Sequence, residues 1–378
     1  FQATCQEMAV DAQQAALQDA ITDLLTMYGP VEADGRERLH RLLMRQHYRL
    51  TSWRNAADEI NWRRFFDVTT LAGLKVEEPM VFETVHATLF RLYSEGLIDG
   101  FRVDHVDGLA DPRAYCLALR KRLLRLRALR PEHAPPGEAY LVLEKILAPG
   151  EQLARDWGVD GTTGYSFMNE VGALAHDPDG ENALRELWIE QTARSGDFDT
   201  EVQAARRRIP QELLAADFNA CAHAFHRLAR AEIGTRDWSL AAIRRVLIEV
   251  LVQLPVYRTY IDASGRSEAD SRVLQEVFAA AARHCRTSEV PLLGAFDRWL
   301  GAPSASTDGS PSLRRLRLRA IARFQQLSSP VAAKSVEDTA FYRHGLLLSR
   351  NEVGADPRQF SLSAEAFHTE GRSRAEHF

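Results

Sequence analysis

Two short apolar runs, each ending in a carboxylate and separated by one amphipathic helix, constrain the fold of this chain most strongly. The first run, residues 97–104, alternates apolar and polar positions toward its end and finishes at Asp104. The second run, residues 139–144, is mostly apolar and finishes at Glu144. A basic amphipathic segment over residues 113–130 lies between them. This order of strand, helix and strand predicts a parallel sheet, in which catalytic groups usually lie at the carboxyl ends of the strands.

A long segment after these runs has helical periodicity only. Over residues 177–327, apolar side chains recur at spacings of three and four, which is typical of amphipathic helices. The clearest series comprises Leu214, Phe218, Cys221, Phe225 and Leu228. The segment predicts an all-helical subdomain inserted into an α/β fold. Beyond it, residues 330–334 are a short apolar run that suggests one more strand.

Composition excludes several classes of protein. The 378 residues are 45% hydrophobic and 26% charged, as in an ordinary globular protein, and the formal net charge of -5 disfavours nucleic acid as a partner. The longest apolar stretch, residues 246–256, contains Glu249 and Gln253, so no membrane span is expected. Four cysteines without a C-x-x-C pair indicate free thiols and a cytoplasmic location. Because the first residue is Phe1 within a helical pattern, we expect a piece of a longer protein.

The strand that ends at Asp104 carries the sharpest chemical signal. Strand alternation turns Arg102 and Asp104 to the same side, and a neighbouring arginine favours an ionised carboxylate, as a nucleophile requires. A structural ion pair at a strand end explains the same residues equally well. Glu144 follows 40 residues after Asp104, on the expected neighbouring strand. Retaining glycosidases need such a pair, with the two carboxyls about 5 to 5.5 Å apart.

At this point the sequence becomes recognisable by its motifs. GFRVDHVDGL resembles the nucleophile strand of the alpha-amylase superfamily, and YLVLEKIL resembles its acid/base strand. Within that superfamily, further blocks resemble the maltooligosyltrehalose synthases in the same order, among them DGTTGYSFMNEV, LPVYRTYI and KSVEDTAFYRHGLLLSRNEVG. The resemblance covers about residues 40 to 357. Several blocks in one order make a chance match improbable.

The resemblance implies roles for five residues. Asp104 is expected to be the nucleophile and Glu144 the general acid/base, while Arg102 supports the nucleophile. His105 is expected to contact the bound sugar, and Lys334 to lie near the reducing-end sugar. A histidine that amylases carry four residues after the nucleophile is Gly108 here, which makes general amylase activity less expected.

The resemblance also implies an architecture. The expected fold is a partial (β/α)8 TIM barrel of the alpha-amylase type with a large helical insertion, truncated at both ends. The expected parts are a helical and loop segment over 1–78, a barrel portion with the catalytic strands over 79–175, the inserted helices over 176–329 and a return to the barrel over 330–378. A third catalytic carboxylate, in a His-Asp motif, is expected beyond Phe378.

The expected activity is that of an isomerase in trehalose biosynthesis. It converts the reducing-end α-1,4 bond of a malto-oligosaccharide into an α,α-1,1 bond by intramolecular transglycosylation, with no cofactor, no metal and a monomeric enzyme. This segment alone is expected to be inactive. Two alternatives stay open from the sequence: a 4-α-glucanotransferase or amylase-like hydrolase, and a glucan-binding protein without catalysis.

Overall fold

The computed structural model describes residues 15–301 and 310–377, and the chain divides after Ala56 into two units. The first unit contains α2 (Ala15–Met27), α3 (Gly35–Leu43) and the short helix η1 (Trp53–Asn55). The inferences drawn from Phe1 and Cys5 fall outside the described residues.

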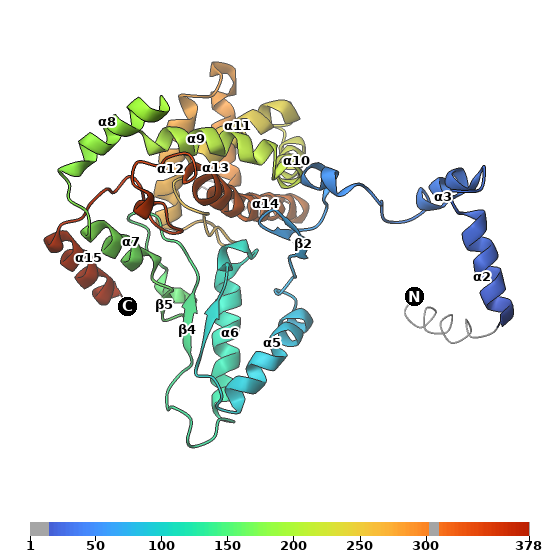
Figure 1. Ribbon diagram of the computed structural model, residues 1–378, viewed down its shortest axis with the longest axis horizontal. Helices are drawn as coiled ribbons and strands as arrows, with labels where there is room; N and C mark the ends of the chain where they lie inside the picture. Colours follow the sequence, from blue (N-terminus) through green and yellow to red (C-terminus); the bar gives the residue numbers. More distant parts are fainter. Residues whose placement is uncertain (1–14, 302–309, 378) are drawn as a thin grey trace. The chain divides into compact units, whose positions relative to one another are not determined.

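A three-stranded parallel sheet organises the beginning of the second unit. Its order is β3 (Gly100–Val103), β4 (Tyr140–Leu143) and β5 (Gly161–Thr162), and α5 (Pro79–Ser94) and α6 (Pro112–Arg127) lie beside it (Figure 1). Apolar side chains from α5, α6 and β4 form one buried cluster, including Phe90, Leu123 and Leu141. The parallel sheet predicted from the strand, helix and strand order is therefore present.

Several short elements precede and follow the strands of this sheet along the chain. They are α4 (Ala56–Glu59), the antiparallel pair β1 (Arg64–Phe65) and β2 (Val68–Ala72), and the short helices η2 (Val106–Gly108) and η3 (Arg155–Trp157). Helix α6 begins directly after η2, because the Asp111 carboxylate accepts a hydrogen bond of 2.9 Å from the Ala114 amide and Pro112 starts the first turn. This start fixes the chain just beyond Asp104.

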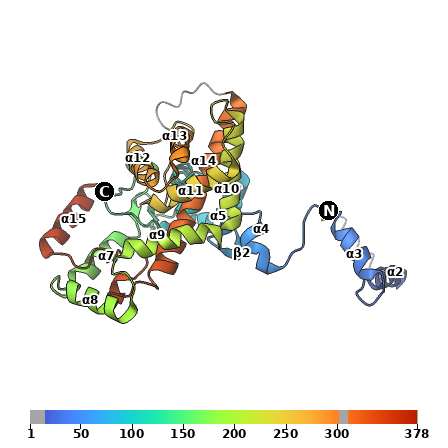
Figure 2. The ribbon, with the colours of Figure 1, turned by 90° about the horizontal axis from the view of Figure 1, so that it is seen from above.

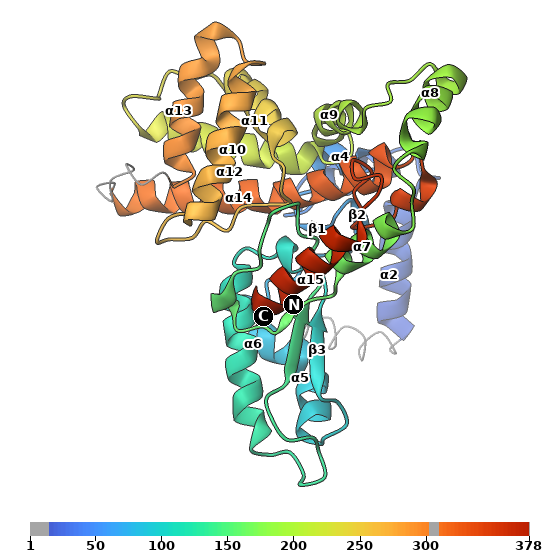
Figure 3. The same cartoon turned by 90° about the vertical axis from the view of Figure 1, so that its left-hand side faces the viewer.

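Between Gly180 and Ser335, the regular elements of the residues that the structure describes are helical. They are α8 (Gly180–Thr192), α9 (Phe198–Arg208), η4 (Ile209–Gln211), α10 (Ala215–Ala231), α11 (Leu240–Gln253), α12 (Glu268–Ala282), η5 (Thr287–Glu289), α13 (Val290–Trp299) and α14 (Pro311–Ser335). Helices α10 to α14 gather around a common apolar core in which Phe225 packs on Phe296 and Trp299 (Figures 2 and 3). Helix α7 (Tyr165–Leu174) lies between the sheet and this group along the chain.

The strand predicted over residues 330–334 is wrong, because these residues belong to α14. The helix continues through Pro330 into the π-helical turn η6 (Val336–Ala340). A short apolar run fits a strand or a buried helix equally, and here the tertiary packing of α14 against α10 decides. The remaining elements are η7 (Leu348–Arg350) and α15 (Ala364–His377), which packs on α7.

The described residues form a helix-rich α/β fold. Their parallel sheet has three strands and does not close into a barrel. The division into four parts stays a prediction. None of the helices in residues 15–301 and 310–377 is long and apolar enough to cross a membrane.

Candidate active site

The two strand-terminal carboxylates predicted from the sequence lie at neighbouring strand ends. Val103 of β3 is paired with Leu143 of β4, and the Glu144 amide donates a hydrogen bond of 2.7 Å to the Val103 carbonyl oxygen. Asp104 and Glu144 follow these paired positions, and both line one cavity of about 190 Å³. The parallel register therefore brings together two carboxyls that are 40 residues apart in the sequence.

Arg102 and Asp104 form an ion pair beside this cavity. Their side chains leave the strand on the same side, as its alternation predicts, and Arg102 Nη1 lies 2.6 Å from Asp104 Oδ1. Each side chain keeps at least half of its surface exposed, so Asp104 is accessible to a ligand. The geometry fits an arginine that orients a carboxylate nucleophile.

Glu144 has the environment of a proton donor. Burial raises the pKa of its carboxyl, the Asp104 and Asp107 carboxylates raise the pKa further, and a hydrogen bond of 2.9 Å from the His105 amide opposes the rise. A general acid has to keep its proton until it donates it to the leaving group. Asp104 and Glu144 thus differ in environment, as a nucleophile and an acid should.

Two residues of the cavity wall adopt the left-handed backbone conformation. His105 has φ of 46° and Phe66 has φ of 51°, and their ring centroids are 4.3 Å apart. A Cβ at Gly108 would lie 2.6 Å from Cδ2 of His105, so no side chain fits at position 108. Gly108 stands where amylases carry a histidine, and the His105 ring occupies the space that a side chain at this position would need. Burial lowers the pKa of His105, so its imidazole is neutral near pH 7.

The structure adds cavity residues to which sequence reasoning gave no role. Tyr165 lines the cavity from α7, Tyr257 from the segment between α11 and α12, and Glu337 from η6. The Tyr257 hydroxyl donates to the Glu337 carboxyl, whose pKa is raised to about 7, mainly by burial. Glu337 follows Lys334 by three positions, or about one helical turn. In the sequence, this spacing indicates that Glu337 lies on the same face of the chain as Lys334.

Lys334 lies beside the cavity rather than in its lining. Its Nζ is 2.7 Å from Asp67 Oδ1 and 2.6 Å from Asp338 Oδ2, and it lies 5.8 Å from the centroid of the Phe66 ring. Lys334 thus reaches the site through Phe66, which does line the cavity.

Aromatic side chains form part of the wall. Phe65 and Phe66 line the cavity, whereas Trp62 lies outside its lining with about half of its surface exposed. Trp53 belongs to the N-terminal unit and is largely exposed there. Of the three aromatic residues Trp62, Phe65 and Phe66 of the second unit, the two phenylalanines line this cavity.

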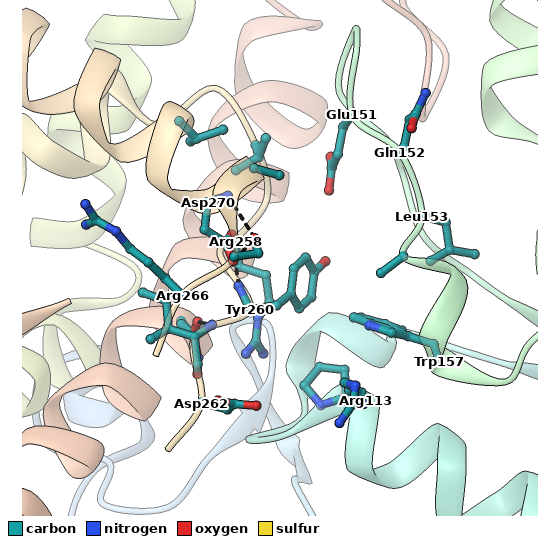
Figure 4. Close-up of a pocket in the computed structure, with 18 of the residues that line it drawn as sticks. Arg113, Glu151, Gln152, Leu153, Trp157, Arg258, Tyr260, Asp262, Arg266 and Asp270 are labelled. Carbon is teal, nitrogen blue, oxygen red and sulfur yellow. Dashed lines mark hydrogen bonds between the residues drawn. The ribbon is translucent and has the colours of Figure 1, made fainter. Parts of the chain in front are cut away.

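A second and larger cavity, of about 1230 Å³, lies elsewhere in the second unit (Figure 4). Tyr260, Trp157, Glu151 and Arg258 are among the residues that line it. Asp104 and Glu144 do not line it, so its size alone does not make it the catalytic site. The part of the chain that the structure describes holds no group of three or more His, Cys, Asp or Glu residues arranged to bind a metal ion.

A parallel strand pair that ends in an ion-paired carboxylate and in a second carboxyl whose pKa is raised by burial, with aromatic side chains in the wall, is similar to the sites of enzymes that process glycosidic bonds. No protein-family model matches the chain. Curated sequences from two strains of Mycobacterium tuberculosis are 35% identical to it over 340 residues, or 88% of the chain, and carry the name "Putative maltooligosyl trehalose synthase".

Solved structures agree with these sequence relatives. The maltooligosyltrehalose synthase from Arthrobacter ramosus is 31% identical, with a TM-score of 0.72 over 89% of this chain. The "hypothetical maltooligosyl trehalose synthase" of Sulfolobus tokodaii is 28% identical, with a TM-score of 0.60 over 90% of this chain. The chain is therefore related by sequence and by fold to the maltooligosyltrehalose synthases. It spans about 38% of the length of the curated relatives that it matches.

Proposed function

We propose that the whole protein containing this chain isomerises the reducing-end α-1,4 bond of a malto-oligosaccharide into an α,α-1,1 bond. The observation that carries the proposal is the placement of Asp104, paired with Arg102, and Glu144, with its raised pKa, in one cavity at neighbouring strand ends. Relatives named maltooligosyltrehalose synthases support the choice of reaction. The three-stranded sheet is proposed to be part of an alpha-amylase type (β/α)8 barrel, and the protein to be a cytoplasmic monomer.

The reaction proceeds in two displacements at one anomeric carbon. Glu144 protonates the bridging oxygen as Asp104 attacks the anomeric carbon, so the α-1,4 bond breaks and a glycosyl ester forms on Asp104. The released glucose stays bound in the cavity and rotates so that its anomeric hydroxyl faces the glycosyl ester. Its anomeric hydroxyl then attacks the ester while Glu144 takes up the proton, which forms the α,α-1,1 bond and frees Asp104. No water is consumed.

The residues around the cavity are proposed to hold the released glucose. His105 and Phe66 offer ring surfaces for the sugar, and Lys334 and Glu337 offer polar groups from the same segment. Retention of the glucose decides the outcome, because water would otherwise hydrolyse the ester.

The 378-residue chain by itself is proposed to be inactive. It spans about 38% of the length of its curated relatives, and Asp104 and Glu144 are two of the three catalytic carboxylates expected by resemblance. Purified chain incubated with maltopentaose should give no new product. Turnover by the chain alone would contradict this statement while leaving the reaction type open.

The reaction type is tested with the whole protein and maltopentaose. A synthase removes reducing ends while the number of glucose units per molecule stays constant. A hydrolase creates reducing ends, and a glucanotransferase leaves their number unchanged while spreading the chain lengths. An increase of reducing ends in step with bond cleavage would refute the synthase, and no reaction with any glucan would favour a non-catalytic binding protein.

Matched carboxylates at the opposite ends of the same strands provide controls for this test. Asp104→Asn should abolish product because an amide cannot form the ester, and Glu144→Gln should lower the rate by about 100-fold or more because the proton donor is lost. Asp99 and Glu138 precede β3 and β4 and are more than half exposed. Asp99→Asn and Glu138→Gln should leave the rate within about twofold, since neither carboxylate lines the cavity that holds Asp104 and Glu144.

A further inference from the structure

Asp107 is a carboxylate beside the catalytic cavity that has no part in the reaction described above. Asp107 follows Asp104 by three residues and is only 3% exposed, although it borders the catalytic cavity. Its Oδ1 accepts a hydrogen bond of 2.5 Å from the Tyr260 hydroxyl, and its Oδ2 lies 3.7 Å from Lys145 Nζ. Protein groups thus engage both oxygens of this buried carboxylate, which favours an effect on the reaction through its neighbours.

The partners of Asp107 come from the acid strand and from the inserted part. Lys145 directly follows Glu144, is 3% exposed, and also contacts Glu151, with 2.7 Å between Nζ and Oε1. Burial alone would lower the pKa of Lys145, but the Asp107 and Glu151 carboxylates raise it above its ordinary value, so the lysine stays charged. The buried ion pair between Asp107 and Lys145 thus joins the turn after Asp104 to the residue after Glu144 at the end of β4.

The backbone of the same turn is held by side chains that lie far away in the sequence. Arg258 is 1% exposed and donates to the carbonyl oxygens of Asp107 at 2.9 Å and Leu109 at 2.6 Å. Arg63 and Gln326 donate to the Gly108 carbonyl oxygen. A charged guanidinium buried among carbonyl oxygens loses much free energy if the turn moves, because its donors would be left unpaired.

Asp107 and Lys145 lie between two cavities. Lys145 borders both the catalytic cavity and the larger cavity in which Tyr260 and Glu151 are seen in Figure 4. The Tyr260 ring packs on Trp157 with 4.9 Å between centroids, which fixes the direction of the hydroxyl. Asp107 is therefore supported from the side opposite to the cavity in which Asp104 and Glu144 meet.

We propose that Asp107 is a positioning residue, which through Tyr260 and Lys145 fixes the turn carrying Asp104 and His105 against the strand end carrying Glu144. Its role in the reaction rests on the proposed function, whereas the tie between the strands does not. A misplacement of about 1 Å between reacting groups can lower a rate by about 100-fold, so a tie of this kind has a kinetic effect.

Tyr260→Phe is the sharpest variant, because it removes one hydroxyl and keeps the ring on Trp157. In the whole protein we expect kcat to fall by about 10- to 100-fold while KM changes by less than about threefold. Tyr115→Phe is the matched control: its hydroxyl bonds to His86 at 2.8 Å, away from the cavity, and its loss should leave kcat within about twofold.

Hydrogen exchange in the chain itself gives a measure that needs no activity. The His105 amide bonds to Glu144 and the Leu109 amide bonds to the Val106 carbonyl oxygen. Both amides should exchange at least about fivefold faster in Tyr260→Phe than in the wild type or in Tyr115→Phe. If the exchange of both amides is unchanged, the proposal is overturned whether or not the protein is an enzyme. If the wild-type protein shows no glycosyl transfer, only the proposed function fails. The exchange rates then still test whether Asp107 and Tyr260 hold the two strand ends together.

A pH profile separates positioning from general support of the fold. The charged or titratable groups that interact with Asp107 or its partners include Lys145, Glu151, Glu144, His105, Arg258, Tyr257, Tyr260 and Cys116. Burial raises the pKa of Glu144 most, and the Asp104 and Asp107 charges add to the rise; in Asp107→Asn one of these charges is absent, so Glu144 loses its proton at a lower pH. The alkaline limb of kcat/KM should move to lower pH. An unmoved limb together with an unchanged kcat would overturn the positioning role.

Discussion

The backbone amide of His105 donates a hydrogen bond of 2.9 Å to Oε2 of Glu144, so the residue after the proposed nucleophile holds the proposed acid. His105 can do this because it leaves β3 in a left-handed conformation, with φ of 46°. Such a conformation is unfavourable for a residue with a side chain, and it persists where the surroundings fix it. This hydrogen bond therefore ties the backbone that follows Asp104 to the Glu144 carboxyl.

Lys334→Ala should change the fate of the released glucose in the whole protein. If Lys334 holds this sugar, the variant should still cleave the chain but release free glucose, raising the ratio of hydrolysis to isomerisation by about tenfold, because one charged hydrogen bond is lost. Product analysis after incubation with maltopentaose measures the ratio. Lys75→Ala, at an exposed ion pair with Glu78, is the control and should keep the wild-type ratio. The same ratio in Lys334→Ala would remove the assigned role.

Glu337 should make the stability of the chain depend on pH. Its pKa is about 7 in the folded chain, above the ordinary value of a carboxyl, so between about pH 4.5 and 7 the folded state binds more protons than the unfolded state. The free energy of unfolding should therefore fall as the pH rises through this range. In Glu337→Gln the fall should be smaller by about 2 to 3 kcal/mol.

Urea unfolding at pH 5 and pH 8 measures this difference. Glu138→Gln, at an exposed carboxylate, should behave as the wild type. Equal pH dependence in Glu337→Gln and the wild type would show that the raised pKa of Glu337 is not a property of the folded chain.

Phe225→Ala should strongly destabilise the helical group. Phe225 is fully buried in α10 and packs on Phe296 and Trp299, so its truncation leaves a cavity that costs about 3 to 5 kcal/mol. Ile233, just beyond α10, is 90% exposed, and Ile233→Ala should change the free energy of unfolding by less than about 0.5 kcal/mol. Chemical denaturation followed by circular dichroism compares the two. A loss below about 1 kcal/mol for Phe225→Ala would contradict the packing.

The cysteine thiols should differ in reactivity in the folded chain. Cys116 and Cys221 are buried, and burial raises the pKa of both thiols, that of Cys116 to about 12. Cys285 is partly exposed and should react with a thiol reagent at least about tenfold faster than these two. Site-resolved mass spectrometry follows each residue. After denaturation without reductant all four cysteines, including Cys5, should react, and fewer reactive thiols would contradict the prediction that they are free.

The sequence alone was sufficient for features that depend on local pattern. Alternation before Asp104 predicted a strand with Arg102 on the same side, and the order of segments predicted that Glu144 follows a parallel neighbour. Periodicity from Leu214 to Leu228 predicted a helix, which is α10. These features are local because the direction of a side chain repeats every 2 residues in a strand and every 3.6 in a helix.

The tertiary structure decided what depends on contacts between distant segments. Residues 330–334 are helical because α14 packs on α10, although the same five residues fit a strand by pattern. Glu337 and Tyr257 meet in the cavity across 80 positions, and the Tyr260 hydroxyl reaches Asp107 across 153. No periodicity within either segment encodes such a pairing, because burial and charge are set by the neighbours that folding supplies. The sequence alone therefore determined which strands carry the carboxyls, and the packing around Glu144 decided that the pKa of its carboxyl is raised by burial.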